Sequence, residues 1–350
     1  MTANGFAKAG PPVTVAEKVR FLSDPGTYAH DPATVEVIET HMSWVFLAGP
    51  KVFKLKKPVR YDFLDFSTIG KRRRAVCDEV QLNRRLAPDL YEVPRPLGIG
   101  ADGRLSLDGA RGQVVDWLVE MRRLPEERNL ERMIGAGDLT PGHIGQVADL
   151  LRGFYGATPP AEIAPEDYAG QFAAEYAKTR AVLTDPALKL DEPQLDAALD
   201  AYDRSYAEAH PLLCQRVRAG HVVEGHGDLR PEHVFLTDAP VIIDCLEFNR
   251  ALRLVDPLDE IAFLGMECAK LGPEWVAGAL YHGLGAALGN PPPVLVEFYW
   301  RYRALLRARL SLLHLVVQPE RTPWKWRPQA RRYVALSCRP ELMRLPPEGR

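Results

Sequence analysis

Residues 221–248 read HVVEGHGDLRPEHVFLTDAPVIIDCLEF, and this stretch decides how the rest of the chain is interpreted. Its β-branched runs are typical of short strands, whereas the segments on both sides have the apolar spacing of helices. HGD at 226–228 opens a loop, and Asp244 ends a very apolar strand. We therefore expect the carboxylates of Asp228 and Asp244 to converge on one point within a helical region.

Two converging carboxylates have different chemical uses. One can orient an attacking hydroxyl and accept its proton, while the other holds a divalent cation that neutralises phosphate charge. Such a pair needs a group elsewhere in the chain that binds phosphate. Lys54 and Lys56 lie on one face of the strand expected at 52–55, and Glu79 on the following helix is placed to hold one of them.

The charge composition excludes some classes of partner. The chain has 350 residues, with 44 Lys and Arg against 46 Asp and Glu, which gives a net charge of -2. This balance argues against a protein built around nucleic acid or an anionic membrane surface. Residues 51–85 do carry a local excess of +7. We interpret it as lysines of a phosphate site together with a solvated helix face, because aromatic residues are not regularly interleaved.

Cysteine usage and hydropathy bear on the compartment. The five cysteines are scattered and never form a CxxC pair, so neither a disulfide framework nor a zinc site is indicated. No apolar run approaches the roughly 20 residues of a spanning helix. We expect a cytoplasmic protein that is not anchored to a membrane, and the sequence does not indicate an oligomeric state.

The first third of the chain is strand-like and the remainder is mostly helical. Ala48-Gly49-Pro50 is a turn signal between two strands, and Pro88 ends a helical segment. In the first third we predict a helix at 15–22, a hairpin across 35–59, a helix at 67–86, and strands at 104–107 and 113–121. Beyond residue 140 we predict a helix starting at Thr140-Pro141 and further helices at 165–183, 193–217, 256–270, 274–288 and 293–317.

The motifs, taken in order, resemble a known family. HGDLRPEHVFL, then VIIDCLEF and VDPLDEIAFL, is similar to the HGDxxxxN loop, metal aspartate and GDPxxDLA series of aminoglycoside phosphotransferase-like kinases. The segments ETHMSWVFLAGPKVFKLKKPVRYDFLDFS and VQLNRRLAPDLY also look like one branch of these enzymes. Some members of that branch carry an additional P-loop domain, and the sequence has no GxxxxGK[ST] motif. The resemblance covers about 35–333.

The resemblance implies a fold and its boundaries. We expect an α+β, two-lobed, protein-kinase-like fold with a small β-rich N-terminal lobe and a larger, mainly helical C-terminal lobe. The expected parts are an N-terminal extension and helix at 1–30, a nucleotide-binding lobe at 31–121, and a helical lobe at 122–345 with its catalytic loop at 224–248.

The resemblance also implies roles for individual residues. Asp228 matches the catalytic aspartate and Asp244 the magnesium aspartate. Lys54, with Glu79 as its helix partner, matches the lysine that binds the nucleotide phosphates, and Lys56 is the alternative. The backbone near Glu120 and Met121 is expected to pair with adenine. Asp256 and Glu260 match the acidic positions that brace the catalytic loop.

The sequence departs from the family pattern at two places. His233 stands where most members have an asparagine that binds the second metal, and imidazole is a poorer ligand than an amide oxygen for magnesium. His233 either coordinates through one nitrogen, favours manganese, or marks lost catalysis. No glycine-rich loop is evident between the first strands, so Ser43 and nearby amides would have to cover the phosphates.

These residues predict an ATP- and Mg²⁺-dependent phosphotransferase, with Mn²⁺ as a further option, acting on a hydroxyl of a small molecule. The acceptor and the choice of ATP over GTP stay open. The alternative is a catalytically weak pseudokinase that binds nucleotide as a regulatory or interaction module, which His233 motivates. Protein-kinase activity ranks lower, because HRD and APE patterns are missing.

Overall fold

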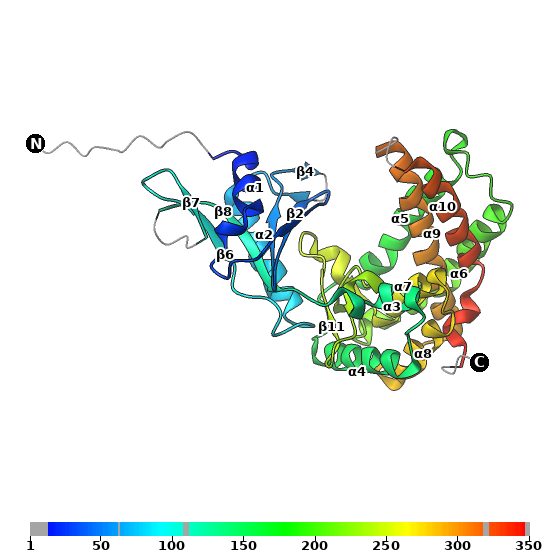
Figure 1. The fold of residues 1–350 in the computed structure, drawn as a ribbon. Helices are drawn as coiled ribbons and strands as arrows, with labels where there is room; N and C mark the ends of the chain where they lie inside the picture. Colours follow the sequence, from blue (N-terminus) through cyan, green and yellow to red (C-terminus); the bar gives the residue numbers. More distant parts are fainter. Residues whose placement is uncertain (1–12, 62–63, 108–111, 318–321, 347–350) are drawn as a thin grey trace, which may run out of the picture. The chain divides into compact units, whose positions relative to one another are not determined.

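The computed structural model describes residues 13–61, 64–107, 112–317 and 322–346. The chain forms two compact units, Met1–Leu124 and Pro125–Arg350. The first is built on an antiparallel sheet and the second is mainly helical, which confirms the predicted α+β class (Figure 1). In the described ranges, no helix is long and apolar enough to cross a membrane.

The first unit contains one six-stranded antiparallel sheet in the order β1-β2-β3-β8-β6-β7. The predicted turn at Ala48-Gly49-Pro50 joins β2 to β3, and Gly49 takes the left-handed conformation there, with φ +59°. The elements are α1 (Val15–Ser23), η1 (Pro25–Thr27), β1 (Val35–Glu39), β2 (Ser43–Ala48), β3 (Lys51–Lys56), β4 (Arg60–Tyr61), β5 (Leu64–Asp65), α2 (Ile69–Asn83), β6 (Arg95–Ile99), β7 (Leu105–Ser106) and β8 (Gln113–Arg122).

Successive side chains of β3 point to opposite faces of this sheet. Phe53 and Leu55 pack with Leu22 of α1 in a buried cluster on one face. Lys54 and Lys56 project from the other face, where Glu79 of α2 binds both ammonium groups. The candidate phosphate lysines therefore share the face with α2, as the alternating sequence predicts.

The buried carboxylate of Asp116 on β8 joins the two helices of the first unit to the sheet. Lys18 of α1 donates to Asp116 Oδ2 at 2.7 Å, and Arg72 of α2 donates to both carboxylate oxygens at 2.8 and 2.9 Å. All three side chains are buried. Removing one partner of a buried ionic group leaves uncompensated charge, so this triad holds α1 and α2 in place.

The second unit encloses short β-pairs within a set of helices, as predicted for 221–248. Strand β9 pairs with β12 and β10 pairs with β11, both antiparallel. The helices are α3 (Leu130–Ala136), α4 (Pro141–Ala157), α5 (Pro165–Leu183), α6 (Leu195–Arg218), α7 (Pro257–Leu271), α8 (Trp275–Leu284), α9 (Pro293–Val317) and α10 (Pro323–Ser337). The strands are β9 (Val223–Glu224), β10 (Val234–Phe235), β11 (Val241–Ile242) and β12 (Leu254–Val255). Short 3₁₀ turns are η2 (Glu126–Arg128), η3 (Pro186–Leu188), η4 (Pro231–His233), η5 (Arg250–Arg253), η6 (Gly285–Leu288) and η7 (Pro340–Arg344).

Helix α7 is buried around most of its circumference and forms the centre of the second unit. It packs against α8 and α9, and α9 in turn packs against α5, α6 and α10. The centre of the unit is thus a buried helix that begins directly after the 221–248 segment and its short connection.

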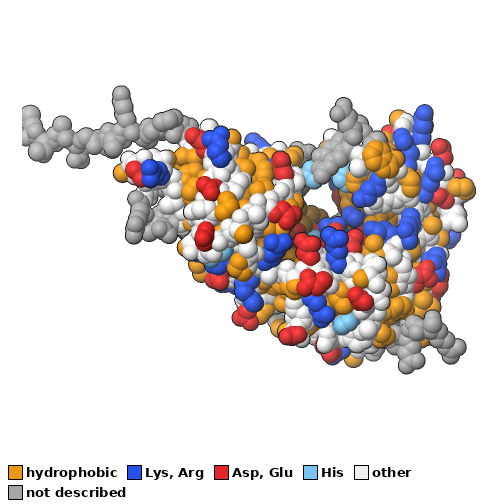
Figure 2. All heavy atoms as spheres, in the orientation of Figure 1, with side chains coloured by type: hydrophobic (Ala, Val, Ile, Leu, Met, Phe, Trp, Pro, Cys, Tyr) orange, Lys and Arg blue, Asp and Glu red, His pale blue; other side chains and the backbone are white. Residues whose placement is uncertain are grey.

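On the visible face of this unit, acidic and basic side chains are interspersed rather than separated into one field of each sign (Figure 2).

Candidate functional site

The loop that carries Asp228 is braced from α7 by Glu260. The Glu260 carboxylate accepts hydrogen bonds from the backbone amides of His226, at 2.9 Å, and Gly227, and from the Tyr155 hydroxyl at 2.9 Å. A Cβ atom at Gly225 would lie 2.5 Å from Glu260 Oε2, so only glycine fits beside the carboxylate. This buried carboxylate fixes the backbone immediately before Asp228.

Asp256 braces the start of the same helix. Its carboxylate caps α7 by accepting from the Leu258 amide, and the Arg216 guanidinium binds it at 2.6 Å through both Nε and Nη2. The Tyr168 hydroxyl accepts from the Asp256 amide at 3.1 Å. Asp256 and Glu260 therefore anchor α7 and the loop respectively, and these contacts support the bracing roles expected from the sequence.

His226 connects the loop to the strand that leads to Asp244. Its Nε2 lies 2.8 Å from the Ile243 carbonyl, and the Asp228 amide donates to its Nδ1 at 3.2 Å. A carbonyl can only accept and an amide N–H can only donate, so the neutral imidazole carries its proton on Nε2. Burial lowers the pKa of His226, which favours this neutral form. The ring thereby fixes Asp228 relative to the residue before Asp244.

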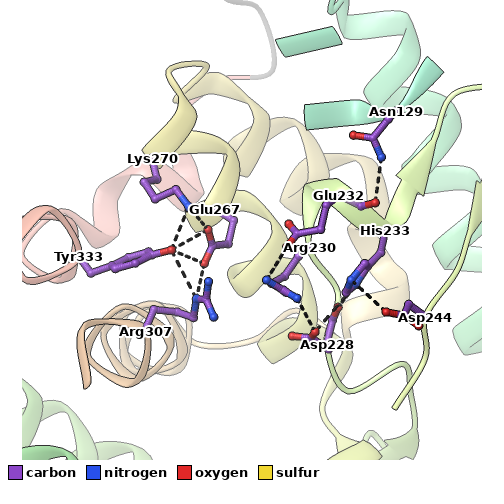
Figure 3. A network of polar contacts seen from close by, with 10 residues as sticks. All are labelled: Asn129, Asp228, Arg230, Glu232, His233, Asp244, Glu267, Lys270, Arg307 and Tyr333. Carbon is purple, nitrogen blue, oxygen red and sulfur yellow. Dashed lines mark hydrogen bonds and ion pairs between the residues drawn. The ribbon is translucent and has the colours of Figure 1, made fainter. Parts of the chain in front are cut away.

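Asp228, His233 and Asp244 lie together at the open end of this arrangement (Figure 3). His233 Nδ1 donates to the Asp228 carbonyl at 2.8 Å, and His233 Nε2 lies 3.7 Å from Asp244 Oδ2. Arg230 Nη2 binds Asp228 Oδ2 at 2.9 Å. The side chains of Asp228 and Asp244 are 26% and 48% exposed. The two carboxylates thus converge around His233 where a ligand can reach them.

The Asp228 carboxylate is ionised at neutral pH. Burial disfavours its charge, but the neighbouring His233 and Arg230 outweigh this and hold the pKa of Asp228 below its usual value. A depressed carboxyl pKa contributes stability that is present above the unfolded value of about 3.9 and is lost as the pH falls through the folded value. Asp228 is therefore a weak base that can accept a hydrogen bond from a hydroxyl group.

Asp244 has a strained backbone. Its φ is +62°, in the left-handed region that residues other than Gly, Asn and Asp rarely occupy. Such a conformation costs on the order of 1–3 kcal/mol and tends to occur at functional sites. The turn directs the chain out of β11 and leaves the Asp244 carboxylate half-exposed beside His233.

In the first unit, Glu79 binds both candidate lysines. Lys54 Nζ lies 3.0 Å from Glu79 Oε1, and Lys56 Nζ lies 2.6 Å from Glu79 Oε2. Lys54 is 16% exposed, whereas Lys56 is 1% exposed and its ammonium lies over the Phe66 ring. Lys54 can therefore reach a ligand without leaving Glu79, and Lys56 belongs to the core.

Ser43 lies at the start of β2, where it is buried and its amide already donates to Thr40 Oγ1 at 3.0 Å. Glu120 pairs with Phe53, so its side chain lies on the sheet face opposite Lys54. There it binds Lys51 and Arg95 and lines a cavity of about 410 Å³.

The backbone expected to pair with adenine is also engaged within the sheet. The Glu120 carbonyl accepts from the Glu92 amide at 2.8 Å, and Met121 pairs with Val52 on one side and Tyr91 on the other. Strand β8 continues to Arg122, so the backbone that leaves the sheet lies just beyond Met121. We therefore do not assign a nucleotide contact to Ser43, Glu120 or Met121.

Residues 55–306 match the family model described as the phosphotransferase enzyme family, which is most of the chain. The chain belongs to this family. Uncharacterized proteins of Mycobacterium tuberculosis and Mycobacterium bovis are 33% identical over 285 residues, covering 80% of this chain and 55% of theirs. The chain thus spans about half the length of these curated relatives.

Solved structures of phosphotransferases and kinases also resemble the chain. A choline/ethanolamine kinase family protein from Mesorhizobium loti is 17% identical with a TM-score of 0.48, covering 95% of both chains. An aminoglycoside phosphotransferase from Streptomyces rimosus, in complex with ADP and streptomycin, is 17% identical with a TM-score of 0.40. The match covers 78% of this chain and 92% of that one.

Several residues at or near the candidate site were not predicted from the sequence. Arg230 follows Asp228 by two positions in the same loop, a local signal that sequence reasoning missed. A second group comes from three separate helices and meets only in the fold: Glu267, Lys270, Arg307 and Tyr333. The sequence suggests only Arg307 of these four, because the arginine-rich helix expected at 293–317 could bring Arg303 or Arg307 to a substrate pocket.

Replacing Glu260 tests how far it braces the loop that carries Asp228. Glu260→Ala leaves the loop amides and the Tyr155 hydroxyl unpaired, so we expect it to destabilise the second unit by about 3–5 kcal/mol. Tyr155→Phe removes only one of these hydrogen bonds, and we expect it to cost about 1–2 kcal/mol. Urea denaturation measures both. Equal and small losses would contradict the bracing role.

The tautomer of His226 gives a pH-dependent prediction. Its folded pKa is lowered, so the unfolded chain binds the proton first, and the stability from neutral His226 falls as the pH drops below the unfolded value of about 6.5. Two-bond ¹H–¹⁵N NMR spectra at pH 6.5 should show a neutral ring protonated on Nε2. A charged ring, or a proton on Nδ1, would contradict the hydrogen-bond assignment.

Proposed function

We propose that the protein is an ATP- and Mg²⁺-dependent phosphotransferase that phosphorylates a hydroxyl group of a small molecule. The observation that carries this proposal is the convergence of Asp228 and Asp244 around His233 in a loop braced by Glu260. Membership of the phosphotransferase family supports the same reaction class. The first unit would supply the nucleotide site and the second unit the acceptor site.

Asp228 is the residue that would act on the acceptor. Its ionised carboxylate accepts a hydrogen bond from the acceptor hydroxyl. This hydrogen bond orients a lone pair of the hydroxyl oxygen toward the γ-phosphorus of ATP. As the new O–P bond forms and the bond from the γ-phosphorus to the bridging β–γ oxygen breaks, the hydroxyl proton passes to Asp228. Because the Asp228 pKa is low, its main contribution is positioning, with proton transfer late in the step.

The residues present fit a cation that arrives with the nucleotide. In the described part of the chain, no group of three or more His, Cys, Asp and Glu side chains could hold a metal ion by itself. Magnesium in phosphoryl-transfer sites is held by one or two carboxylates together with substrate phosphates. The exposed Asp244 carboxylate is the residue that would hold it, and a bound cation would neutralise charge on the phosphates.

His233 would add a nitrogen ligand to that cation. Its Nδ1 donates to the Asp228 carbonyl, so Nε2, which lies 3.7 Å from Asp244 Oδ2, is the nitrogen that a cation would bind. A nitrogen at this position suits Mn²⁺ better than Mg²⁺. This arrangement supports coordination by His233, with a preference for Mn²⁺, over the reading that His233 marks lost catalysis.

Lys54 would bind the nucleotide phosphates while Glu79 holds its side chain. An ammonium group kept in one orientation loses less conformational entropy on binding phosphate than a free lysine does. Lys56 also binds Glu79, but it is buried with its ammonium against the Phe66 ring. It would therefore position Glu79 and have no contact with the nucleotide.

The phosphotransferase proposal is tested by measuring ADP formation over a panel of hydroxylated small molecules with Mg²⁺ and with Mn²⁺. We expect at least one compound to stimulate turnover, and Asp228→Asn to reduce that turnover by at least about 10²-fold, because the acceptor hydroxyl loses its carboxylate. Nucleotide that binds without turnover above the Asp228→Asn level would overturn the proposal.

The two lysines give a matched pair of variants. Lys54→Met should weaken binding of ATP with magnesium about 10-fold or more, since a charge-assisted hydrogen bond contributes about 1.5–3 kcal/mol. Lys56→Met should leave this affinity within about threefold and instead lower thermal stability. Isothermal titration calorimetry measures both affinities. The reverse order would assign the phosphate contact to Lys56.

A further inference from the structure

We propose that the acceptor carries an anionic group, a carboxylate or a phosphate, which Arg307 and Lys270 bind beside Asp228. This inference rests on the proposed phosphotransfer function and names the class of its acceptor. It comes from the cluster of Glu267, Lys270, Arg307 and Tyr333, which joins α7, α9 and α10 and which the reaction itself does not use (Figure 3).

Within this cluster, one buried carboxylate serves two cations. Glu267 accepts from Lys270 Nζ at 2.7 Å, from Arg307 Nε at 2.6 Å and from the Tyr333 hydroxyl at 2.7 Å. Lys270 also donates to the Tyr333 oxygen at 3.0 Å. With two positive charges and one negative charge, the cluster has an excess of +1.

Arg307 keeps most of its hydrogen-bonding capacity unused. Among the described residues, only its Nε donates, to Glu267 at 2.6 Å and to the Tyr333 oxygen at 3.4 Å. In the ranges that the structure describes, its terminal nitrogens Nη1 and Nη2 have no hydrogen-bond partner, and they are not among the buried unpaired atoms. The side chains of Arg307 and Lys270 are 18% and 19% exposed, so both can be reached by a ligand.

The cluster lies next to the residue proposed to position the hydroxyl. Figure 3 shows the Arg307 guanidinium turned toward Arg230 and Asp228. Burial opposes the charge of Arg307, but the carboxylates of Glu267 and Asp228 contribute to a net rise in its pKa. Burial opposes the charge of Arg230 as well, but the carboxylates of Asp228 and Glu232 outweigh burial and the nearby Arg307 charge and raise the pKa of Arg230. An anion held by Arg307 would therefore lie on the side of Arg307 that faces Asp228.

Charge decides which acceptors suit this place. Arg230 is already bound by the carboxylates of Asp228 and Glu232, so the open positive group is the Arg307 guanidinium, which an anion would pair with and an amine would be repelled by. The planar Nη1 and Nη2 fork of Arg307 matches the paired oxygens of a carboxylate or phosphate. Lys270 adds a further donor, held in orientation by Glu267 and Tyr333.

The test compares four three- or two-carbon probes: glycerate, glycerol 3-phosphate, glycerol and ethanolamine. Calorimetry with and without ADP measures their binding, and phosphoryl transfer from ATP is measured in parallel. We expect glycerate or glycerol 3-phosphate to bind and the other two not to. The preferred probe shows whether the site takes a carboxylate or a phosphate. Arg307→Met should weaken this binding by about 10–100-fold, with unchanged ATP affinity.

Arg309→Met is the matched control, because Arg309 lies on the same helix and binds Glu175 instead. It should leave probe affinity unchanged, and Arg307→Lys should restore part of it. In kinetics, Arg307→Met should raise KM for the acceptor more than it lowers kcat.

The outcomes separate the two proposals. Binding or transfer only with glycerol or ethanolamine, no binding of either anionic probe, or equal losses in Arg307→Met and Arg309→Met would overturn the anionic acceptor while phosphotransfer could still stand. Arg307-dependent binding of an anion together with turnover that Asp228→Asn does not change would support the anion site and overturn the proposed role of Asp228 in phosphotransfer.

Discussion

The structure of the site depends on one buried carboxylate. Among the described residues, Glu260 forms no salt bridge. It accepts hydrogen bonds from the amides of His226 and Gly227 and so fixes a loop that has little regular secondary structure of its own. Because α7 is buried on nearly all sides, this loop inherits the rigidity of the centre of the helical unit. A short loop held to a core helix in this way can keep Asp228 in one orientation without a ligand.

The second link is the neutral imidazole of His226. It joins the Asp228 amide to the Ile243 carbonyl, so the two carboxylate-bearing segments move as one. A charged ring could not accept a hydrogen bond from the Asp228 amide, and burial lowers the pKa of His226, which favours the neutral ring. Glu260 and His226 together explain how two aspartates 16 positions apart in sequence come to share one site. Arg230, which binds the carboxylates of Asp228 and Glu232, adds a cation beside this site.

Most of the secondary structure could be predicted from the sequence, because strong turn, cap and periodicity signals mark it. The turn at 48–50 and the helix Pro293–Val317 are found where they were expected. β6 was missed because Pro96 and Gly98 interrupt it, and α10 was missed because its many charged residues and internal proline hide its apolar face.

The site was predictable where residues are close in sequence or fall within an ordered series of motifs. The convergence of Asp228, His233 and Asp244 could be predicted for that reason. The choice of Lys54 over Lys56 depends on burial under Phe66, which spacing does not reveal. Glu120 faces away from Lys54 because of the register between β3 and β8, and Arg307 approaches Asp228 only through helix packing. Long-range packing of this kind leaves no mark on a single sequence.

The central claim is that the braced loop transfers a phosphoryl group from a nucleotide to a hydroxyl. ³¹P NMR of the protein with ATP, Mg²⁺ and a hydroxylated acceptor follows that transfer directly. The account predicts a new phosphomonoester resonance that grows as the γ-phosphate signal declines, and its absence with Asp228→Asn. Loss of the γ-phosphate signal to inorganic phosphate alone, or the same ester formed by Asp228→Asn, would contradict it.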